Sequence, residues 1–291
     1  MTTPTADPLH KSAIAHLLRA CSDEIAVTVV QQTSSTNDLA RAWLDGRELG
    51  QPGVAAFASE RQTAARARRG RNWFSAPGQA VLLSIALCTP HTPAGTNAYG
   101  SPMTRGGWEE WPLLAAIAAR RALQDVAGQG GSVIDIQLKW PNDLMVHGRK
   151  LAGILCEQSS GGLVIGIGVN VHGDMASAAP ELALTATSLA QEGARVSRNS
   201  VIAAVIRHTF ELFAQTQRGL RFSDLRCEYT RASSTVGKQI VVVQGTRTLS
   251  GIARQVDGQG ALWLETGDGR LVAVAAGEVI EGDREGGYPI G

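Results

Sequence analysis

The run AVLLSIALC, residues 80–88, is the stretch around which the rest of the chain can be arranged. A continuously apolar run of this length predicts a strand buried on both faces, because a half-exposed strand would alternate apolar with polar residues. Such a strand needs helices on both sides of its sheet. We therefore expect an α+β fold in which a mixed β-sheet is flanked by helices.

Two more strands are predicted upstream, over residues 25–30 (IAVTVV) and 54–59 (VAAFAS), from their β-branched and apolar residues. Between them, the hydroxyl residues at 34–36 favour a helix N-cap, and apolar residues then recur at helical spacing. A strand is thus expected to enter a hydroxyl-rich turn and then an amphipathic helix. Residues 1–27 are expected to be a short lead-in, with helical character around 14–18.

Downstream, residues 89–108 are rich in Pro, Gly and Thr, which predicts a surface insertion, and an apolar helix is expected over 112–126. IDIQLKW, residues 134–140, alternates apolar with polar residues before a proline and is predicted to be a strand. A hairpin is expected to turn at His147–Gly148, and residues 161–170 supply the strand after it.

Two helices are predicted next, an amphipathic one over 201–213 capped by Asn199 or Ser200, and another around 222–231. From Ser233 onward the chain consists of short β-runs separated by glycine-rich turns. That pattern fits a small all-β barrel after the α+β domain.

The composition excludes several classes of protein. Lys plus Arg total 27 and Asp plus Glu total 26, which excludes a globally basic nucleic-acid binder but not a local basic patch. Cys21, Cys88, Cys156 and Cys227 form no CxxC pair, which indicates reduced, mostly buried thiols. No apolar run has the length of a membrane helix and no signal-peptide core is found, so a cytoplasmic protein is expected.

Residues 61–71, RQTAARARRGR, hold five arginines and no acidic residue, and Trp73 follows. Guanidinium groups concentrated in one loop repel one another unless an anion neutralises them, and an indole can stack on an aromatic base. The segment therefore suggests a loop for a ligand with phosphate and an aromatic base. A solvated charged loop and a patch for single-stranded nucleic acid remain open.

Two of the chain's four lysines, Lys139 and Lys150, lie close together in the sequence, and Lys139 is expected at the end of a strand. A compact ammonium there can neutralise a carboxylate and a phosphate together, although an exposed lysine on an edge strand is the alternative. Asn142 and Asp143, which follow Pro141, can fix the local turn through their side chains.

Two uncharged motifs complete the candidates. The hydroxyl and amide groups of residues 34–37 can cap a helix or can hydrogen-bond a neutral cyclic amide or urea. The glycines of GIGVN, residues 166–170, indicate close approach by a backbone or a ligand, and Asn170 could read a base edge or end the strand.

Together these motifs resemble the biotin–protein ligases over roughly residues 28–280. The resemblance implies the class II synthetase-like, biotin–lipoate ligase fold, with a catalytic domain at 28–232, an SH3-like β-barrel at 233–283 and a tail at 284–291. The motifs that carry it are STN at 35–37, ERQTAxRxRRGRxWFS at 60–75, LKWPNDL at 138–144, GRKLAGIL at 148–155 and GIGVN at 166–170.

The resemblance implies that biotin and MgATP give biotinyl-5′-AMP and pyrophosphate, after which biotin passes to one lysine of a biotin carboxyl carrier domain. ATP and Mg²⁺ are the implied cofactors, with the metal ligands unassigned. The implied catalytic residues are Lys139, Arg66 and Arg68. The implied biotin-binding residues are Ser35, Thr36, Asn37, Gln62, Arg66, Ala67, Arg68 and Lys139. The implied nucleotide-binding residues are Arg66, Arg68, Arg69, Arg71, Trp73, Asn142, Lys150 and Asn170.

The sequence departs from the family's pattern in two places. The family's loop usually reads GRGRRG, whereas this chain has Ala65 and Ala67. If those positions need a positive φ, each alanine costs about 1 kcal/mol or more, and the loop would close less tightly over an adenylate. Repressor-type members also carry a winged helix-turn-helix before the STN motif, whereas 34 residues precede Ser35 here, so no specific DNA binding is expected.

Two alternatives remain. A lipoate or octanoate ligase or transferase would share the fold and a lysine-centred site. A nucleic-acid-binding module would use the arginine segment and would show a steep salt dependence, but it leaves Lys139 unexplained. A carrier domain is the expected partner, no membrane is expected, and both a monomer and a homodimer remain open.

Overall fold

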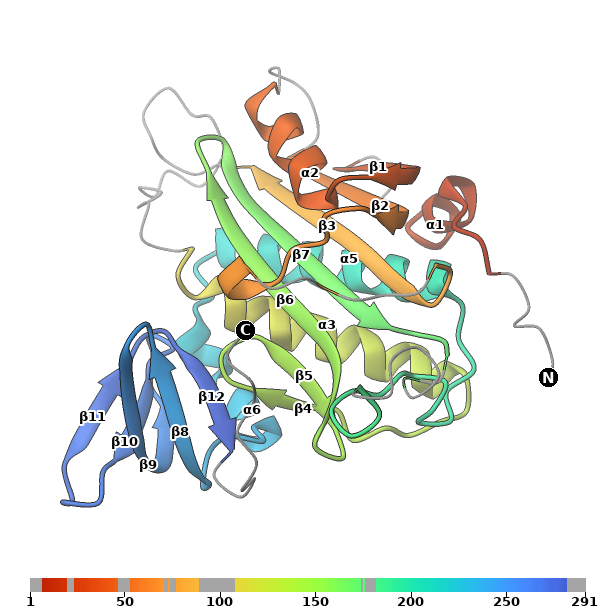
Figure 1. Cartoon of the computed structure of the whole chain (residues 1–291). Helices are drawn as coiled ribbons and strands as arrows, with labels where there is room; N and C mark the ends of the chain where they lie inside the picture. Colours follow the sequence, from red (N-terminus) through yellow and green to blue (C-terminus); the bar gives the residue numbers. More distant parts are fainter. Residues whose placement is uncertain are drawn as a thin grey trace.

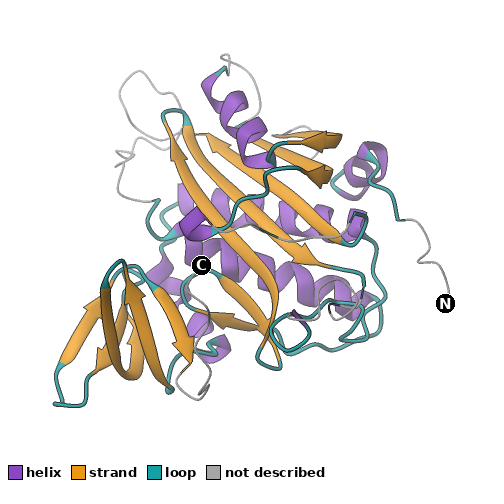
Figure 2. Cartoon of the chain, viewed as in Figure 1, coloured by secondary structure: helices purple, strands orange, loops and turns teal. Residues whose placement is uncertain are grey.

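The computed structural model describes residues 7–19, 24–46, 53–70, 73, 77–88, 108–173, 175 and 182–281. Two β-sheets dominate these residues, a large mixed sheet with helices against it and a smaller antiparallel sheet beside it (Figures 1 and 2). Residues 89–107 of the predicted surface insertion lie outside the described residues.

The large sheet has seven strands in the order β1-β2-β3-β7-β6-β5-β4. β1 and β2 run parallel, and the other neighbouring pairs are antiparallel, so the sheet is mixed, as expected. Its strands are β1 (Ile25–Thr33), β2 (Val54–Gln62), β3 (Ala80–Cys88), β4 (Gln137–Lys139), β5 (Asp143–Val146), β6 (Arg149–Ser159) and β7 (Gly162–Asn170).

All of β3 is buried near the middle of this sheet, which confirms the strand predicted from AVLLSIALC. Helices α3 (Trp111–Gln129) and α5 (Arg198–Gln217) pack on one face, and α2 (Thr36–Asp45) packs on the other, mainly against β2, β3 and β7 (Figure 1). Part of the second face is therefore not covered by α2. No helix within the described ranges is long and apolar enough to cross a bilayer.

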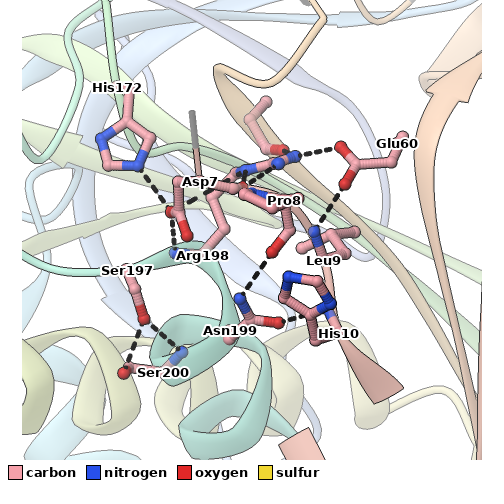
Figure 3. A network of polar contacts seen from close by, with 11 residues as sticks. Asp7, Pro8, Leu9, His10, Glu60, His172, Ser197, Arg198, Asn199 and Ser200 are labelled. Atoms are coloured by element: carbon pink, nitrogen blue, oxygen red, sulfur yellow. Dashed lines mark hydrogen bonds and ion pairs between the residues drawn. The ribbon is translucent and has the colours of Figure 1, made fainter. Parts of the chain in front are cut away.

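The segment before β1 packs into the main body. Helix α1 (Lys11–Leu17) lies against α5 and β1, and its Ile14 is fully buried. Arg198, whose side chain is 1% exposed, pairs with Glu60 at 2.8 Å and donates to the backbone carbonyl of Asp7 (Figure 3). The Arg198 N–H also donates to Asp7 Oδ2, at 2.6 Å. A buried guanidinium thus fastens the N-terminal segment to the end of β2.

The predicted cap of α5 is wrong. The cap is Ser197, whose hydroxyl accepts from the Ser200 N–H at 3.1 Å. The reason is that the Asn199 side chain is used elsewhere, since its amide donates to the Pro8 carbonyl at 2.9 Å. The helix therefore starts earlier than its apolar pattern indicated.

The strand predicted over residues 134–140 is shorter than expected. Its alternation is confirmed, because every second residue is buried, namely Ile134, Ile136, Leu138 and Trp140. Only β4 pairs with β5, however, since the Ile136 N–H bonds the Ile134 carbonyl and the Ile136 carbonyl accepts from Arg120. The backbone before Gln137 thus makes its hydrogen bonds outside the sheet.

Helix α6 (Phe222–Ala232) leads into the smaller sheet, whose strand order is β11-β10-β9-β8-β12. All of its neighbouring pairs are antiparallel, which is consistent with the SH3-like unit expected after Ser233. Its strands are β8 (Gln239–Gln244), β9 (Arg247–Val256), β10 (Leu262–Glu265), β11 (Leu271–Val274) and β12 (Glu278–Glu281).

The cysteines are less buried than predicted. Cys88 is buried and Cys156 is half-buried, but Cys227 is exposed, and none of these three forms a disulfide. Cys227 is exposed because it lies about 140° round α6 from Phe222, which is fully buried. Cys21 lies outside the described residues.

Candidate active site

The N-terminus of α2 meets the end of β2. Ser35 caps the helix, since its hydroxyl accepts from the Asn37 N–H at 3.3 Å. Gln62 Oε1 accepts from the Thr36 N–H at 2.6 Å and from the Thr36 hydroxyl at 3.3 Å. β2 runs beyond its predicted end at Ser59 and so brings Gln62 to the Ser-Thr-Asn turn.

Ser84, the one polar residue of β3, lies beneath this turn and is fully buried. Its hydroxyl lies 2.7 Å from Thr36 Oγ1 and 2.5 Å from Asn37 Oδ1. Gly166 on β7 leaves room for the amide, because a Cβ there would lie 2.4 Å from Asn37 Oδ1. Ser84 was not among the predicted site residues, although a single hydroxyl in an otherwise apolar strand was a visible signal.

The carboxylate of Glu157, on β6, contacts three polar side chains. Its carboxylate accepts from the Asn37 amide at 2.5 Å and lies 3.3 Å from Arg41 and 3.6 Å from Arg66. Arg66 also pairs with Asp38 at 2.7 Å, and this guanidinium lowers the pKa of Asp38. One arginine of the predicted loop is therefore held by two carboxylates, which sequence reasoning did not find.

Arg68 lies away from α2, beside Asn142 and the smaller sheet. Its guanidinium donates to Asn142 Oδ1 at 3.0 Å and to the Gly277 carbonyl of the smaller sheet at 3.2 Å. The Asn142 amide in turn donates to the Ile154 carbonyl at 2.6 Å. The arginine loop thus spans the distance from α2 to the turn that follows Lys139. The side chain of Arg69 and the whole of Arg71 lie outside what the structure describes.

The expected strain at the loop alanines is absent. Ala65 and Ala67 do not have a positive φ, whereas Gly70, at the end of a short 3₁₀ turn (Arg68–Gly70), has φ 71°. Ala65 is buried, and its carbonyl accepts from the Trp73 N–H. The left-handed position therefore falls on a glycine that the chain retains, and neither alanine carries the cost of a positive φ.

Trp73 lies on two glycines of the sheet. A Cβ at Gly168 would be 2.6 Å from the indole ring, and a Cβ at Gly153 would be 3.0 Å from it. The ammonium of Lys150 lies 5.7 Å from the ring centroid and 2.7 Å from Asp143 Oδ1. The indole Nε1 is buried, and no described residue accepts its hydrogen bond. An aromatic plane with an unused donor therefore lies beside a cation.

Lys139 ends β4 and is half-buried. Pairing places it opposite Asp143, Asp143 opposite Gly153, and Gly153 opposite Gly168, so these residues form a row on one face of the sheet. Within the described part of the chain, the Lys139 ammonium has no hydrogen-bond or ion-pair partner. A free cation thus stands in the row that leads to Trp73.

The side chain of Asn170 hydrogen-bonds to backbone carbonyls. Its amide donates to the Thr187 carbonyl at 3.0 Å and to the Lys150 carbonyl at 3.4 Å. The side chain therefore joins the end of β7 to the neighbouring strand and loop.

The described residues offer no ready metal cage. Among them, no group of three or more His, Cys, Asp or Glu side chains could hold a metal ion. The Mg²⁺ implied by the resemblance does not fit these residues as an all-protein site, and no step below is routed through it.

Comparisons with known proteins identify the family to which the chain belongs. The model of the Biotin/lipoate A/B protein ligase family matches residues 29–174, and that of the Biotin protein ligase C terminal domain matches residues 235–281. The biotin–[acetyl-CoA-carboxylase] ligase of Mycobacterium tuberculosis is 34% identical over 269 residues, which are 91% of this chain and 92% of that protein. The ligase of the same name from Paracoccus denitrificans is 30% identical over 257 residues, 85% of this chain and 98% of that protein.

A solved structure has the same fold. The biotin protein ligase from Aquifex aeolicus in complex with biotin and ATP superimposes with a TM-score of 0.71 at 21% identity, over 88% of this chain and 99% of that one. With two family models matched in order and a relative alike over nine-tenths of its length, the chain belongs to the biotin protein ligase family.

Proposed function

We propose that this chain joins biotin to ATP, giving biotinyl-5′-AMP and pyrophosphate, and then transfers biotin to a lysine of a biotin carboxyl carrier domain. The observation that carries the proposal is the placement of Lys139. Its ammonium has no partner among the described residues and stands in the row of the sheet that ends under Trp73. A cation so placed can lie between a ligand's acid tail and a nucleotide phosphate.

The polar cluster under α2 would hold the biotin ring. We call it the ring end and define it as Ser35, Thr36, Asn37, Gln62 and Ser84. Its hydroxyl and amide groups can both donate and accept, as a neutral cyclic urea requires. The other groups proposed to contact biotin are Arg66, Ala67 and Arg68 of the loop and Lys139 at the carboxylate.

The surface around Trp73 would hold ATP. We call it the nucleotide end and define it as Arg68, Trp73, Lys139 and Lys150. Trp73 would cover the adenine, because an indole ring can stack on an aromatic base. The further groups proposed on this side are Arg66, Arg69, Arg71, Asn142 and Asn170.

The first step brings two anions together. A carboxylate oxygen of biotin attacks the α-phosphorus of ATP; the new P–O bond forms as the bond to the bridging oxygen breaks, and pyrophosphate leaves with the electron pair. Lys139 and the loop arginines would neutralise the charge that develops on the phosphate oxygens. Fixed cations aimed at developing charge stabilise the transition state more than the ground state.

The second step releases AMP. The neutral ε-amine of the acceptor lysine attacks the biotinyl carbonyl carbon, the C–O bond to AMP breaks, and the amine loses a proton to solvent. Because water could attack the same carbonyl, the arginine loop must cover the adenylate and then open for the carrier. Its Arg66–Asp38 pair is more than a third exposed on both sides and its Arg68–Asn142 bond is part-buried, so we expect both contacts to be exchanged for ligand phosphates.

The remaining assignments are also proposals. Catalysis would belong to residues 28–232, while residues 233–283 would form the SH3-like unit and 284–291 a tail. The carrier would be a domain of a biotin-dependent carboxylase, and we expect the reaction to take place in the cytoplasm. We expect ATP to arrive with Mg²⁺ held largely by its phosphates.

The test is biotin-dependent exchange of labelled pyrophosphate into ATP, followed by transfer of biotin to a carrier domain. We expect exchange with biotin and none with lipoate or octanoate. Calorimetry should show tight binding of biotin that strengthens with ATP and is lost in Lys139→Ala. Exchange supported by lipoate but not by biotin would replace the proposal with the lipoate ligase reading.

A further inference from the structure

The segment that joins α6 to the smaller sheet also pairs with the strand that carries Lys139. Ser233 forms a parallel bridge with Leu138, and the Ser234 N–H donates to the Leu138 carbonyl at 2.9 Å. On its other side, β4 pairs with β5 through Lys139 and Asp143. The backbone that carries Lys139 is therefore clamped between β5 and the connecting segment.

The residue after Lys139 is held by the same segment. The backbone N–H of Trp140 donates to Thr235 Oγ1 at 3.0 Å, and the Trp140 indole donates to the Gly260 carbonyl at 3.0 Å. Trp140 is 2% exposed and Thr235 is 1% exposed, so water cannot replace either partner. A buried donor that loses its acceptor carries its full desolvation penalty, which makes this contact a strong constraint.

The clamp is anchored in the smaller sheet. The Gly237 N–H donates to the Ala253 carbonyl at 2.7 Å, and the Ala253 N–H donates to the Lys238 carbonyl at 2.9 Å. Gly260 has φ 87°, and a Cβ there would lie 2.6 Å from Leu113 Cδ1 of α3. Thr235 is therefore a fixed point from which the end of β4 takes its position.

We propose that Thr235 is a positioning residue for Lys139, acting through the Trp140 N–H. Because the Lys139 side chain is long and flexible, the position and direction of its backbone determine where the ammonium can lie. Without the Thr235 hydroxyl, the end of β4 would shift to find another acceptor, and the ammonium would move with it. This inference rests on the proposed function, since it concerns the same site and the same reaction.

The test compares Thr235→Val with Thr235→Ser in the full-length chain. Valine keeps the shape of threonine and removes the acceptor, whereas serine keeps the hydroxyl. We expect kcat for biotin-dependent pyrophosphate exchange to fall at least about tenfold in Thr235→Val, toward the roughly 10²-fold loss that a misplacement of about 1 Å can cause. Thr235→Ser should stay within about threefold of wild type, because its hydroxyl keeps the constraint.

A matched control separates positioning from general damage. Thr209 on α5 is also fully buried, and its hydroxyl has no hydrogen-bond partner among the described residues. Thr209→Val makes the same chemical change and should leave kcat unchanged. Circular dichroism and a melting curve for each variant fix a temperature at which every variant is folded.

A double-mutant cycle with Lys139→Gln supplies a readout that a structural role would not move. If Thr235 acts through Lys139, Thr235→Val lowers kcat in the wild-type background and changes it by less than about twofold when Lys139 is already Gln. Equal losses in both backgrounds would overturn the proposal, as would a Thr235→Val variant with wild-type kcat. A wild-type chain without biotin-dependent exchange would instead overturn the proposed function.

Discussion

The ring end and the nucleotide end of the proposed site are built in different ways. At the ring end, Ser84, Thr36 and Asn37 are almost completely buried, and each polar side chain already has a partner. At the nucleotide end, the Trp73 indole N–H and the Lys139 ammonium have no hydrogen-bond partner among the described residues. The ring end is therefore ordered before a ligand binds, whereas the nucleotide end contains polar groups that have not yet found a partner among those residues.

The difference matches the two kinds of ligand chemistry. A neutral urea gains little from long-range attraction, so its donors and acceptors must already be in place, and ordering them at binding would weaken affinity. Phosphates attract cations over several ångströms, so an arginine can leave a protein partner and swing to the ligand. We therefore expect substitutions at the ring end to act on biotin binding and substitutions at the nucleotide end to act on ATP binding and turnover. Lys139, which would contact both ligands, should affect biotin binding as well.

The largest effect is expected from Lys139→Gln. It removes the cation proposed to lie between the biotin carboxylate and the α-phosphate, and loss of such a preorganised contact lowers kcat by about 10²–10³. Steady-state pyrophosphate exchange measures it. Lys11→Gln, on the exposed side of α1, is the matched control and should behave as wild type. A Lys139→Gln variant that retains more than a tenth of wild-type kcat would contradict the assignment.

Gly166 and Gly168 of β7 give the sharpest separation of the ring end from the nucleotide end. A methyl group at Gly166 would meet the Asn37 amide, while a methyl group at Gly168 would meet the Trp73 ring. Overpacking of this kind costs about 1–3 kcal/mol of stability, and the part of it that falls on the ligand site would raise KM by up to roughly 100-fold. Gly166→Ala should raise KM for biotin, and Gly168→Ala should raise KM for ATP.

Each glycine variant serves as the control for the other, since the same change is made two residues apart on one strand. Both KM values should be measured for both variants by pyrophosphate exchange. If both variants raised the same KM by the same factor, the division into two ends would be wrong.

The sequence predicted those features that depend on neighbouring residues. The buried strand β3, the Ser35 cap and the hairpin at His147–Gly148 all follow from local patterns, and the structure has each of them. Lys139 was also expected at a strand end, and it ends β4. Such features need no knowledge of which strands become neighbours.

The features that were missed depend on long-range pairing. Glu157 meets Asn37 across 120 residues, and Ser84 meets it across 47, because the strand order brings β6 and β3 beneath α2. A backbone angle is equally hidden: whether Ala65 and Ala67 need a positive φ was left open, and the positive φ of this loop is at Gly70. Neither a contact between distant strands nor a loop conformation can be read from spacing.

A smaller effect is expected from Ser84→Ala. It removes the hydroxyl that fixes both Thr36 and Asn37, and an unsatisfied buried group costs about 1–3 kcal/mol. We expect KM for biotin to rise about 5- to 20-fold while kcat changes little, because the ring end would be less ordered before binding. Ser197→Ala, which removes the α5 cap, should lower stability by about 1 kcal/mol and leave KM for biotin unchanged. If KM for biotin rose in both Ser84→Ala and Ser197→Ala, the increase would reflect lost stability and not a change at the ring end.

The smallest effect is expected from Asp38→Asn, which releases Arg66 from one of its carboxylates. Both side chains are more than a third exposed, so the pair stabilises the fold by less than about 1 kcal/mol. Because Arg66 lowers the pKa of Asp38 below its ordinary 3.8, the contribution is fully present above that value and is lost as the pH falls through the lower folded pKa. Urea unfolding should therefore show a small, constant difference between wild type and variant from pH 7 to pH 5, and a shrinking one below about pH 4. If the difference grew on acidification, Asp38 would not be the group that holds Arg66, and the loop would be fastened mainly by Glu157.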